Sequence, residues 1–384
     1  MLTPRQQEAL DAVDAHGGNV SAAGRSLNIT KRGFERLVKR ARAAITKNTV
    51  PVPGPGGITI HELWDGQKLK GYSGCFHHEK GEIMRWVKTN EDLDRTLEIL
   101  SQQIESWVSD LQHKIAPIQA PKVCYDDLMT CYPMGDPHFG LYCWAKEVGN
   151  DFNLDIAEAE LFAAVDYLVH QSPPSHRAVL VNLGDFFHYD SMENLTPASG
   201  HVLDSDTRPQ RMIDIGIRAL RRCLQRMLEK HEIVEMINAP GNHDPILSRA
   251  MNVFFRNIYE NEPRIKIYDE PTTRHYIEHG KCLIGVTHGD KTKDPSLPGI
   301  MATEMPEAWG RTKFRHFWRG HHHHDSVLEL NGCKVEQFRT LAPGDAYAVG
   351  HGYLSGRDMK AVVFHREYGE QARFTCGIDV LKAA

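Results

Sequence analysis

The sequence lacks any long apolar run. No stretch of the 384 residues approaches the roughly 20 consecutive apolar residues that a membrane-spanning helix needs. The first residues, Met1 to Gln7, contain no apolar core that could act as a secretion signal. These two absences argue against a membrane or secreted protein. We expect a protein of the cytoplasm, or of the host cytoplasm if it is encoded by a phage.

The sequence also lacks paired cysteines. Its eight cysteines are scattered along the chain, and no two of them form a C-x-x-C pair. This spacing argues against a disulfide framework and against a zinc finger, and it indicates reduced thiols. Histidine, in contrast, is abundant, with 22 residues. Several histidines stand beside Asp, Asn and Gly at the ends of predicted strands, where a metal site would need them.

A large excess of one charge is missing as well, because the net charge of the whole chain is −5. The charge is unevenly distributed, however. Residues 1–50 carry nine basic and four acidic side chains, which gives +5 and leaves −10 for the rest of the chain. A basic segment attached to an acidic body predicts that any contact with nucleic acid begins at the N-terminus.

Residues 4–46 predict three short helices. The buried faces of the first and third helices are expected at Ala9, Leu10, Val13, Ala15, Phe34, Leu37 and Val38. A tight turn with Thr30 as the N-cap joins the second helix, 19–27, to the third. Two helices joined by a tight turn, the second of them basic, are typical of a helix-turn-helix module. The alternative is a generic three-helix bundle with a solvated charged face.

The basic side chains of the third predicted helix are the candidates for contacting DNA. They are Lys31, Arg32, Arg36, Lys39 and Arg40. Arginine and lysine mostly contact phosphate, so none of these residues can be assigned to reading a base.

Residues 47–57 predict a linker, because their proline and glycine content cannot support a helix or a central strand. Residues 58–121 predict a connector that packs on its neighbours. Within it, Leu69 to Phe76 and Ile83 to Lys88 form the two strands of a predicted β-hairpin. A long helix over 90–114 is expected to follow the hairpin.

The rest of the chain, residues 122–384, predicts an α/β domain in which apolar strands alternate with amphipathic helices. The strands are expected at 128–134, 178–183, 233–238, 282–287 and 316–318. The helices are expected near 156–170, 209–231 and 245–260. In such folds ligands gather at the carboxyl ends of the strands.

Each of the five predicted strands ends in a cluster of metal-capable residues. The clusters are Gly135-Asp136-Pro137-His138, the segment from Gly184-Asp185 to Asp190, Gly241-Asn242-His243-Asp244, His288-Gly289-Asp290 and the segment from Gly320 to Asp325. Glycine beside a ligand lets the backbone turn sharply and approach an ion closely. Taken singly each cluster is a weak signal, and the histidine run resembles a solvated loop or a tag. The ordered set of five predicts a metal centre.

This ordered set resembles the calcineurin-like metallophosphoesterase superfamily, whose pattern is D-x-H, G-D, G-N-H-[DE], H and G-H-x-H. The resemblance covers about residues 126–345 and implies a four-layer α/β/β/α sandwich that holds two divalent ions. The first ion would be bound by Asp136, His138, Asp185 and His323. The second ion would be bound by Asp185, Asn242, His288 and His321.

The donor types suit the chemistry that the resemblance implies. Imidazole and carboxylate bind borderline divalent ions, with Mn²⁺ as the first choice and Fe²⁺, Zn²⁺ or Ni²⁺ as alternatives. A carboxylate shared by two ions can hold them about 3.5–4 Å apart, the separation used for in-line displacement at phosphorus. By the resemblance His243 is the catalytic histidine that binds no metal, and Asp244 orients it. His243 would stabilise the developing charge or protonate the leaving alkoxide.

The histidine run has two possible registers. In an extended chain His321 and His323 share one face, while His322 and His324 share the other. The G-H-x-H pattern favours the first pair as ligands, with the second pair as the alternative.

Three further residues near the clusters are candidates for contacting the substrate. His188 and Asp190 would either touch the substrate or support the ligands from behind. Arg208 ends a long polar segment, 191–208, and is a candidate phosphate contact. The alternative for this segment is a solvated surface loop.

The second and third clusters differ from those of the protein phosphatases in the superfamily, which typically show G-D-x-V-D-R-G and G-N-H-E. Here the second cluster reads Gly-Asp-Phe-Phe-His-Tyr-Asp from Gly184, and the third ends in Asp244. Both departures favour the nuclease branch, so the chain looks similar to the DNA-repair exonucleases of bacteria and phages. We therefore predict a DNA phosphodiesterase, with nucleic acid as its partner.

Two other functions compete with this prediction. One is a phosphomonoesterase or nucleotide phosphatase of the same fold. The other is a non-catalytic DNA-binding regulator with a relic metal site. Only 60 residues follow His324, too few for the capping and partner-docking regions of the double-strand-break repair nucleases. We therefore expect no dedicated ATPase partner.

Overall fold

The computed structural model divides the chain into two units, Met1–Leu100 and Ser101–Ala384. The first unit is described at 4–16, 23, 25–27, 29–30, 34 and 37–38, and for strand segments at 52–53, 59–60, 67–77 and 81–91. The second unit is described at 118–190, 195–197, 200 and 202–383.

The first unit contains a small apolar core around helix α1, Pro4–Ala15. The buried side chains described there are Ala9, Val13, Ala23, Phe34 and Val38. The predicted inward faces are thus confirmed, except that Ala15 is exposed. Ala15 lies two positions beyond Val13, which places it on another side of the helix. The candidate DNA contacts, Lys31, Arg32, Arg36, Lys39 and Arg40, lie outside the described residues, so the helix-turn-helix module stays a prediction.

The same unit contains two antiparallel strand pairs. The short pair is β1, Val52–Pro53, with β2, Thr59–Ile60, and the long pair is β3, Gln67–His77, with β4, Gly81–Glu91. The long pair confirms the predicted hairpin and extends it at both ends. The short pair begins inside the segment that was expected to be only a linker. The predicted helix over 90–114 lies almost wholly outside the described residues.

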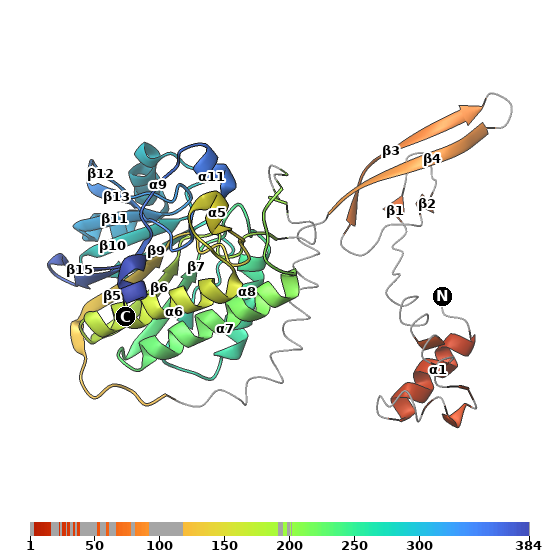
Figure 1. The fold of residues 1–384 in the computed structure, drawn as a ribbon, viewed down its shortest axis with the longest axis horizontal. Helices are drawn as coiled ribbons and strands as arrows, with labels where there is room; N and C mark the ends of the chain where they lie inside the picture. Colours follow the sequence, from red (N-terminus) through yellow and green to blue (C-terminus); the bar gives the residue numbers. More distant parts are fainter. Residues whose placement is uncertain are drawn as a thin grey trace. The chain divides into compact units, whose positions relative to one another are not determined.

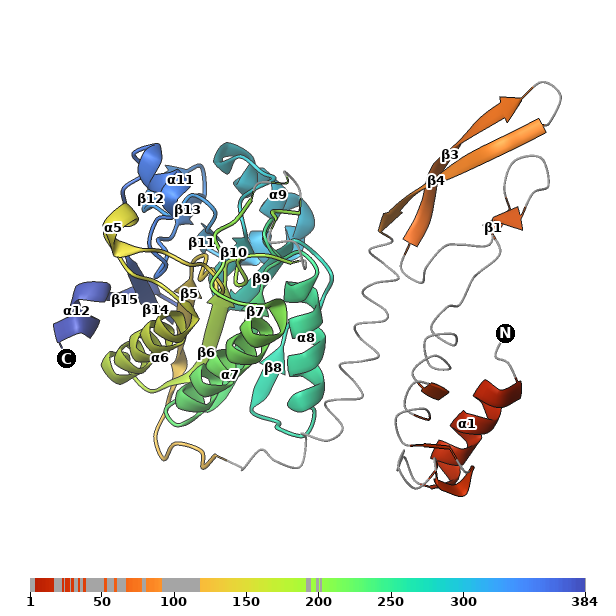
Figure 2. The same ribbon diagram turned by 45° about the vertical axis from the view of Figure 1, so that its right-hand side comes forward.

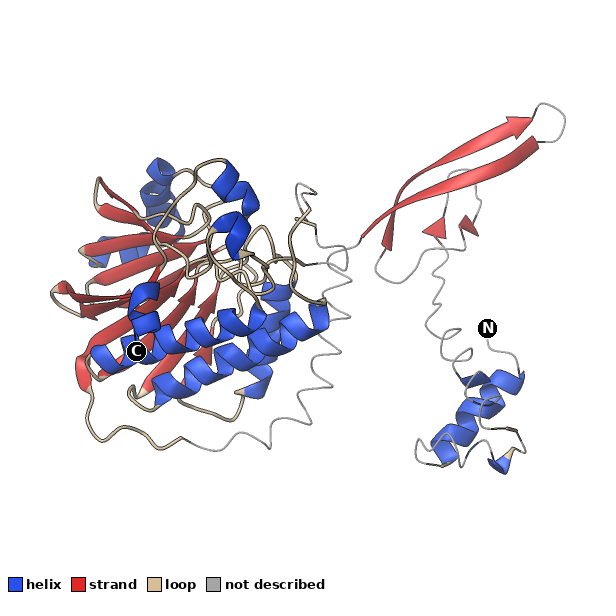
Figure 3. Ribbon diagram, viewed as in Figure 1, coloured by secondary structure: helices blue, strands red, loops and turns tan. Residues whose placement is uncertain are grey.

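The second unit contains two β-sheets (Figure 3). The larger sheet has six strands in the order β15-β14-β5-β6-β7-β8. These are β5, Tyr125–Met134; β6, Ser175–Asn182; β7, Ile233–Asn238; β8, Ile265–Ile267; β14, Asp358–His365; and β15, Gly369–Gly377. Strands β5 to β8 are parallel, whereas β14 pairs antiparallel with both β5 and β15.

The smaller sheet has five strands in the order β12-β13-β11-β10-β9. These are β9, Arg274–His279; β10, Cys282–Thr287; β11, Phe314–Arg319; β12, Ser326–Leu330; and β13, Cys333–Gln337. The three central strands are parallel, and the two outer strands run antiparallel to them.

Helices cover the outer faces of the two sheets (Figures 1 and 2). The larger sheet carries α6, Leu154–Gln171; α7, Pro209–Leu228; α8, Leu247–Ile258; and α12, Ile378–Ala383. The smaller sheet carries η2, Asp294–Ser296; α9, Leu297–Glu304; and α10, Pro306–Arg311. Two short helices, α5, Ala145–Val148, and α11, Ala346–Gly350, lie against each other. No helix among the described residues is both long and apolar enough to cross a membrane.

Three apolar layers hold these elements together. The layer between the sheets contains Val179 and Ile237 from the larger sheet and Ile284 and Trp318 from the smaller one. A second layer lies between the larger sheet and its helices, and a third lies between the smaller sheet and α9 and α10. The order of helices, sheet, sheet and helices confirms the predicted four-layer α/β/β/α sandwich.

The five predicted strands correspond to β5, β6, β7, β10 and β11, and the three predicted helices to α6, α7 and α8. The strands that the sequence did not reveal include the edge strands β8, β9, β12 and β15, which are short or carry polar residues and so lack a clear apolar run. Strand β14 was also missed, although it pairs on both sides and is buried from Asp358 to Phe364, because its apolar run covers only Ala361 to Phe364.

A buried polar network lies within the second unit. The Tyr132 hydroxyl lies 2.7 Å from Ser172 Oγ and 2.8 Å from His231 Nε2. On the other side of the imidazole, Ser175 Oγ lies 2.9 Å from His231 Nδ1. Burial lowers the pKa of His231 from its ordinary value of 6.5 to about 4.

We expect His231 to make folding stability depend on pH. The folded protein keeps this imidazole neutral, whereas the unfolded chain protonates it near pH 6.5. The unfolded state therefore binds more protons between pH 6.5 and 4, and stability is lost as the pH falls through that window. The loss from this group should reach roughly 3 kcal/mol at most.

Denaturant titration of the wild type and of His231→Gln checks this expectation. Glutamine keeps hydrogen-bonding capacity but does not titrate. The free energy of unfolding should fall less steeply in the variant between pH 6.5 and 4. Equal slopes would assign the pH dependence to other groups.

Candidate metal centre

The carboxyl ends of five strands deliver the side chains of the site. From the larger sheet, β5 leads to Asp136 and His138, β6 to Asp185, and β7 to Asn242 and His243. From the smaller sheet, β10 leads to His288 and β11 to His321 and His323. Because the strands run parallel within each sheet, their ends meet at one edge of the sandwich.

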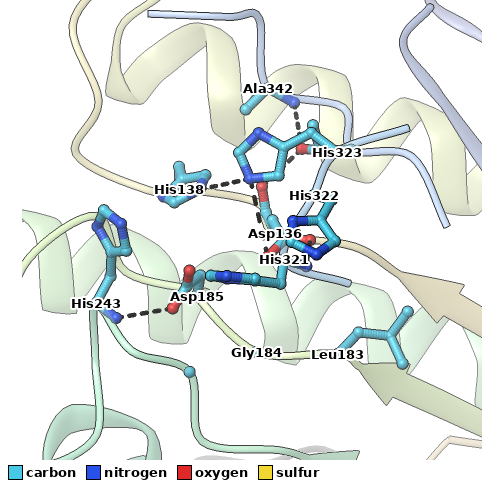
Figure 4. A network of polar contacts seen from close by, with 12 residues as sticks. Asp136, His138, Leu183, Gly184, Asp185, His243, His321, His322, His323 and Ala342 are labelled. Atoms are coloured by element: carbon cyan, nitrogen blue, oxygen red, sulfur yellow. Dashed lines mark hydrogen bonds and ion pairs between the residues drawn. The ribbon is translucent and has the colours of Figure 1, made fainter. Parts of the chain in front are cut away.

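One group of donors consists of Asp136, His138 and His323, whose ligand atoms lie within 4.8 Å of one another. His138 Nε2 lies 3.2 Å from His323 Nε2, and His323 Nε2 lies 3.9 Å from Asp136 Oδ1. Figure 4 shows the rings of His138 and His323 directed toward each other near Asp136. These are three of the four residues that the sequence assigned to the first ion.

A second group consists of Asp185, His288 and His321 and meets the same distance limit. His288 Nε2 lies 3.1 Å from Asp185 Oδ2 and 3.2 Å from His321 Nδ1. Asn242 Oδ1 lies 2.9 Å from the same His288 nitrogen. All four residues expected at the second ion are therefore together, whereas the bridging role of Asp185 stays a prediction.

The spacing of these nitrogens fits a shared divalent ion. Two imidazole nitrogens that each lie about 2.1 Å from one ion are separated by roughly 3.0–3.4 Å in octahedral or tetrahedral geometry. The His138–His323 and His288–His321 nitrogen pairs, at 3.2 Å each, fall in that range. The donors are nitrogen and oxygen only, which suits Mn²⁺, Fe²⁺, Zn²⁺ or Ni²⁺.

Backbone strain is concentrated at the same residues. Among the described residues, every non-glycine residue with positive φ is a predicted ligand: Asp136 at 41°, His138 at 47°, Asp185 at 48°, His321 at 73° and His323 at 56°. Non-glycine residues rarely adopt this conformation, and residues that do so tend to cluster at active sites and ligand clamps. The strain thus marks the site independently of the sequence motifs.

Glycines next to the ligands leave room for them. A Cβ built on Gly241 would overlap Oδ1 and the backbone nitrogen of Asp185. A Cβ built on Gly320 would overlap the carboxylate of Asp136. These two positions therefore require glycine because a ligand carboxylate occupies the space of the side chain.

Electrostatics keeps most of the imidazoles neutral. Burial lowers the pKa of His321 and of His323 to about 4 and places the pKa of His138 well below its ordinary value. Neutral imidazole is the form that binds metal. The exception is His288. Burial alone would lower its pKa, but the Asp185 and Asp136 carboxylates outweigh burial and raise it to about 10. A bound cation would replace that proton as the partner of the two carboxylates.

His243 lies at the edge of the donor groups. Its backbone nitrogen donates to Asp185 Oδ1 at 2.8 Å, and its ring packs edge-on against His138, with centroids 4.9 Å apart. Nδ1 of His243 lies 2.8 Å from the carbonyl oxygen of His188. That carbonyl fixes the ring and leaves Nε2 as the atom that can exchange a proton with a substrate.

His188 lies in direct contact with one of the predicted metal ligands. Its Nδ1 lies 3.2 Å from Nδ1 of His138, and the two histidines form a third group of donors with His243. Burial lowers the pKa of His188 to about 3. Its Nε2 is buried and has no hydrogen-bond partner in the part of the chain that the structure describes.

The structure gives Asp244 a different role from the predicted one. Its Oδ2 accepts from the Phe187 backbone nitrogen at 3.0 Å, and its Oδ1 accepts from the Gly241 nitrogen at 3.2 Å. It therefore joins the second and third ligand loops, and the His188 carbonyl orients His243 instead. A carboxylate buried beside backbone donors satisfies them before it can reach a neighbouring ring.

Asp190 also acts on the backbone. Its carboxylate accepts from the nitrogens of Ile246 at 2.6 Å and Leu247 at 2.8 Å, where α8 begins. This contact satisfies free donors at the start of the helix and fixes the loop that carries His243.

The histidine run adopts the predicted register for a different reason. His321 and His323 belong to the donor groups. His322 and His324 stack on each other, with centroids 6.0 Å apart. The segment is not an extended strand, because His321 and His323 have positive φ. The backbone is left-handed at His321 and His323, and this conformation directs their rings toward the other donor residues.

An open cleft of about 780 Å³ exposes the donor groups. The donor residues that line it are His138, Asp185, His321 and His323, and His243 lines it with them. Much of the remaining wall comes from residues 340–357, which the sequence had not singled out. Within this stretch the Thr340 hydroxyl donates to the Asp136 carbonyl oxygen at 2.6 Å and supports the ligand loop. No motif marks such a contact, since it joins residues far apart in the chain.

Arg208 does not line this cleft. It is exposed and occupies the N-cap position of α7. The described part of segment 191–208 is joined to the body, because Ser205 bridges to Leu141 and Asp206 Oδ2 accepts from the Leu154 nitrogen at 2.9 Å. A phosphate contact by Arg208 stays a prediction.

No protein-family model matches the sequence, and no curated protein sequence matches it. The chain is similar to several solved structures at low identity. One is a conserved uncharacterized protein described as a predicted phosphoesterase from Streptococcus pneumoniae, with 14% identity, 65% of this chain and 98% of that chain covered, and a TM-score of 0.28. Another is described as a novel archaeal phosphodiesterase, with 13% identity, 65% and 100% covered, and a TM-score of 0.33.

A third similar structure is Vps29 of Entamoeba histolytica in complex with zinc, with 11% identity, 65% of this chain and 99% of that chain covered, and a TM-score of 0.27. Because all three TM-scores are low, the fold assignment rests on the sheets and layers of this chain itself.

We expect Gly241→Ala to weaken metal binding. The added methyl group would displace the Asp185 carboxylate, which belongs to the second donor group. Isothermal titration with Mn²⁺ should show at least a tenfold weaker affinity, which corresponds to about 1.4 kcal/mol. Circular dichroism should show that the fold persists.

Gly299→Ala is the matched control, because a Cβ built on Gly299 meets nothing within 4 Å. This variant should bind Mn²⁺ like the wild type. Equal affinities for both variants would contradict the assignment of Asp185 as a ligand.

Proposed function

We propose that the protein is a metal-dependent phosphoesterase of the calcineurin-like superfamily. The observation that carries this proposal is the pair of donor groups, Asp136-His138-His323 and Asp185-His288-His321, at one edge of the sandwich. Oxygen and imidazole donors arranged in this way suit two neighbouring divalent ions. The motif order of the sequence and the concentration of backbone strain at these residues both support the same proposal.

Each residue of the site has a role in this reaction. Two bound ions would supply Lewis-acid polarisation of a phosphoryl oxygen and a hydroxide nucleophile near neutral pH. The Asp136 and Asp185 carboxylates would balance the positive charge of the two ions. His243, held through Nδ1 by the His188 carbonyl, presents Nε2 to protonate the leaving oxygen or to stabilise its charge.

The proposed substrate is a phosphodiester bond of nucleic acid, DNA in the first place. The second ligand cluster lacks the protein-phosphatase pattern, and residues 1–50 carry a net charge of +5. Such a basic segment would concentrate a polyanion near the cleft.

We expect His243→Ala to lose activity without losing metal. With Mn²⁺ and a chromogenic phosphodiester, kcat should fall by on the order of 10²- to 10⁴-fold, because the variant lacks a positioned proton donor. Metal analysis should give an unchanged content, since His243 is peripheral to the two donor groups that carry the proposal. Chelation of the wild type should abolish turnover.

The same assay separates the competing functions. Faster hydrolysis of a monoester than of a diester would favour a phosphomonoesterase. An unchanged rate in His243→Ala would contradict the proposed mechanism. No hydrolysis of either ester by the metal-loaded wild type would favour a regulator with a relic site.

We expect deletion of residues 1–50 to weaken DNA binding and to flatten its dependence on salt. Fewer cationic side chains would release fewer counterions from the phosphates, so log Kd should vary less with log salt concentration. Fluorescence anisotropy over a salt series measures both effects. Unchanged binding would give this segment a role in protein interaction or folding.

A further inference from the structure

Three neighbouring aromatic rings lie on the segment of α11 and the loop after it, and two of them line the cleft that exposes the donor groups. We call Tyr347, His351 and Tyr353 the aromatic rim. The ring centroids of Tyr347 and His351 are 4.1 Å apart at 35°, and those of His351 and Tyr353 are 5.7 Å apart at 20°. Tyr347 and Tyr353 line the same cleft as His138 and His243.

The backbone holds the aromatic rim in place. The Asp345 carboxylate accepts from the Ala348 nitrogen at 2.7 Å and begins α11. One turn later, His351 Nδ1 lies 2.8 Å from the Tyr347 carbonyl oxygen, and the Tyr353 nitrogen donates to the Ala348 carbonyl oxygen at 2.9 Å. The stack is therefore formed in advance of any ligand, which reduces the ordering cost of binding one.

The aromatic rim is open to solvent. Tyr347 is 62% exposed, Tyr353 is 64% exposed and the adjacent Leu354 is 78% exposed. The buried clusters of the described residues do not include these side chains. Contiguous exposed rings along a cleft mark a surface that contacts something else.

The residue types of the loop limit the chemical class of ligand that the aromatic rim can bind. Residues 343–356 contain no lysine and no arginine, and their one acidic residue, Asp345, is engaged at the start of α11. The loop therefore offers rings but no lysine or arginine to a ligand. Arg357, which follows the loop and also lines the cleft, is engaged by the Glu160 carboxylate and the Leu341 carbonyl oxygen. Phosphate groups would find their partners elsewhere in the cleft, at the donor groups that also line it.

We propose that the aromatic rim stacks an unpaired nucleobase adjacent to the phosphate that the metal centre cleaves. This inference rests on the proposed function and adds to it the substrate class: a phosphoester that carries a nucleobase, in a single strand or in a free nucleotide. Every base has a π-face, so stacking on Tyr347 and Tyr353 tolerates any sequence. Base-paired duplex would have to open before it could bind in this way.

Another part of the molecule offers a matched control. Tyr368, in the turn between β14 and β15, is 68% exposed and lies over His365 with centroids 4.5 Å apart at 36°. This pair resembles Tyr347 with His351 in geometry and exposure. It lies at the end of β14 where His365 pairs with Leu128 near the start of β5, away from the ligand end of that strand.

The first experiment measures binding to the full chain in chelator, where no hydrolysis occurs. The two ligands are a fluorescent thymidine decamer and a decamer of equal length with abasic sites, which has the same phosphates but no bases. The wild type should bind the thymidine decamer on the order of tenfold more tightly. Tyr347→Ala with Tyr353→Ala should remove this preference, and Tyr368→Ala should keep it.

The second experiment compares two esters with the same leaving group on the Mn²⁺-loaded protein. These are the p-nitrophenyl ester of thymidine 5′-monophosphate and methyl p-nitrophenyl phosphate. The double tyrosine variant should lose on the order of tenfold in kcat/KM for the thymidine ester, mainly through KM, and nothing for the methyl ester. Competition by free thymidine monophosphate at the rim would identify a nucleotide as the source of the base, and its absence would identify a strand.

The outcomes separate this inference from the proposed function. Equal binding of both decamers by the wild type, or a preference that survives in the double variant, would overturn the inference, whether or not the esters are cleaved. A preference that depends on the rim, with no ester cleaved, would support the base site and overturn the phosphoesterase proposal.

Discussion

The site depends on a fold that holds several carboxylates and imidazoles close together in a small buried volume. Two buried carboxylates and several buried imidazoles face one another at distances near 3 to 4 Å, where desolvation and repulsion act against the arrangement. Five of these residues also adopt a strained backbone conformation. The apolar layers on both faces of the larger sheet fix the strand ends firmly enough to impose this geometry.

The sequence allowed the layers and the composition of the site to be predicted. The runs that became β5, β6, β7, β10 and β11 are apolar because both of their faces are covered, and each stops where a metal-capable cluster begins. Because the carboxyl ends of parallel strands lie at one edge of a sheet, the clusters could be predicted to lie together even though the loops could not be predicted. The G-H-x-H pattern also pointed to His321 and His323 rather than His322 and His324, although the segment is not the extended chain that was assumed in sorting the four rings.

The roles of individual side chains could not be predicted in the same way. Asp244 and Asp190 carry the residue type of a catalytic acid, yet both accept hydrogen bonds from backbone nitrogens of other loops. The aromatic rim lies between β13 and β14 and carries no motif, so its position on the cleft depends on the path of the chain between these two strands. Partners that are distant in sequence leave no local pattern.

The donors come from both sheets, since Asp136 belongs to the end of β5 and His323 to the end of β11. An ion bound by both residues would link the two sheets. The unfolded chain does not bring these donors together, so it would bind the ion more weakly. Its binding energy would then count toward folding as well as toward chemistry. Without the metal, the free energy of unfolding would be lower and this edge of the sandwich would open more readily. The concentration of free divalent cation would then affect the stability of the protein as well as its turnover rate.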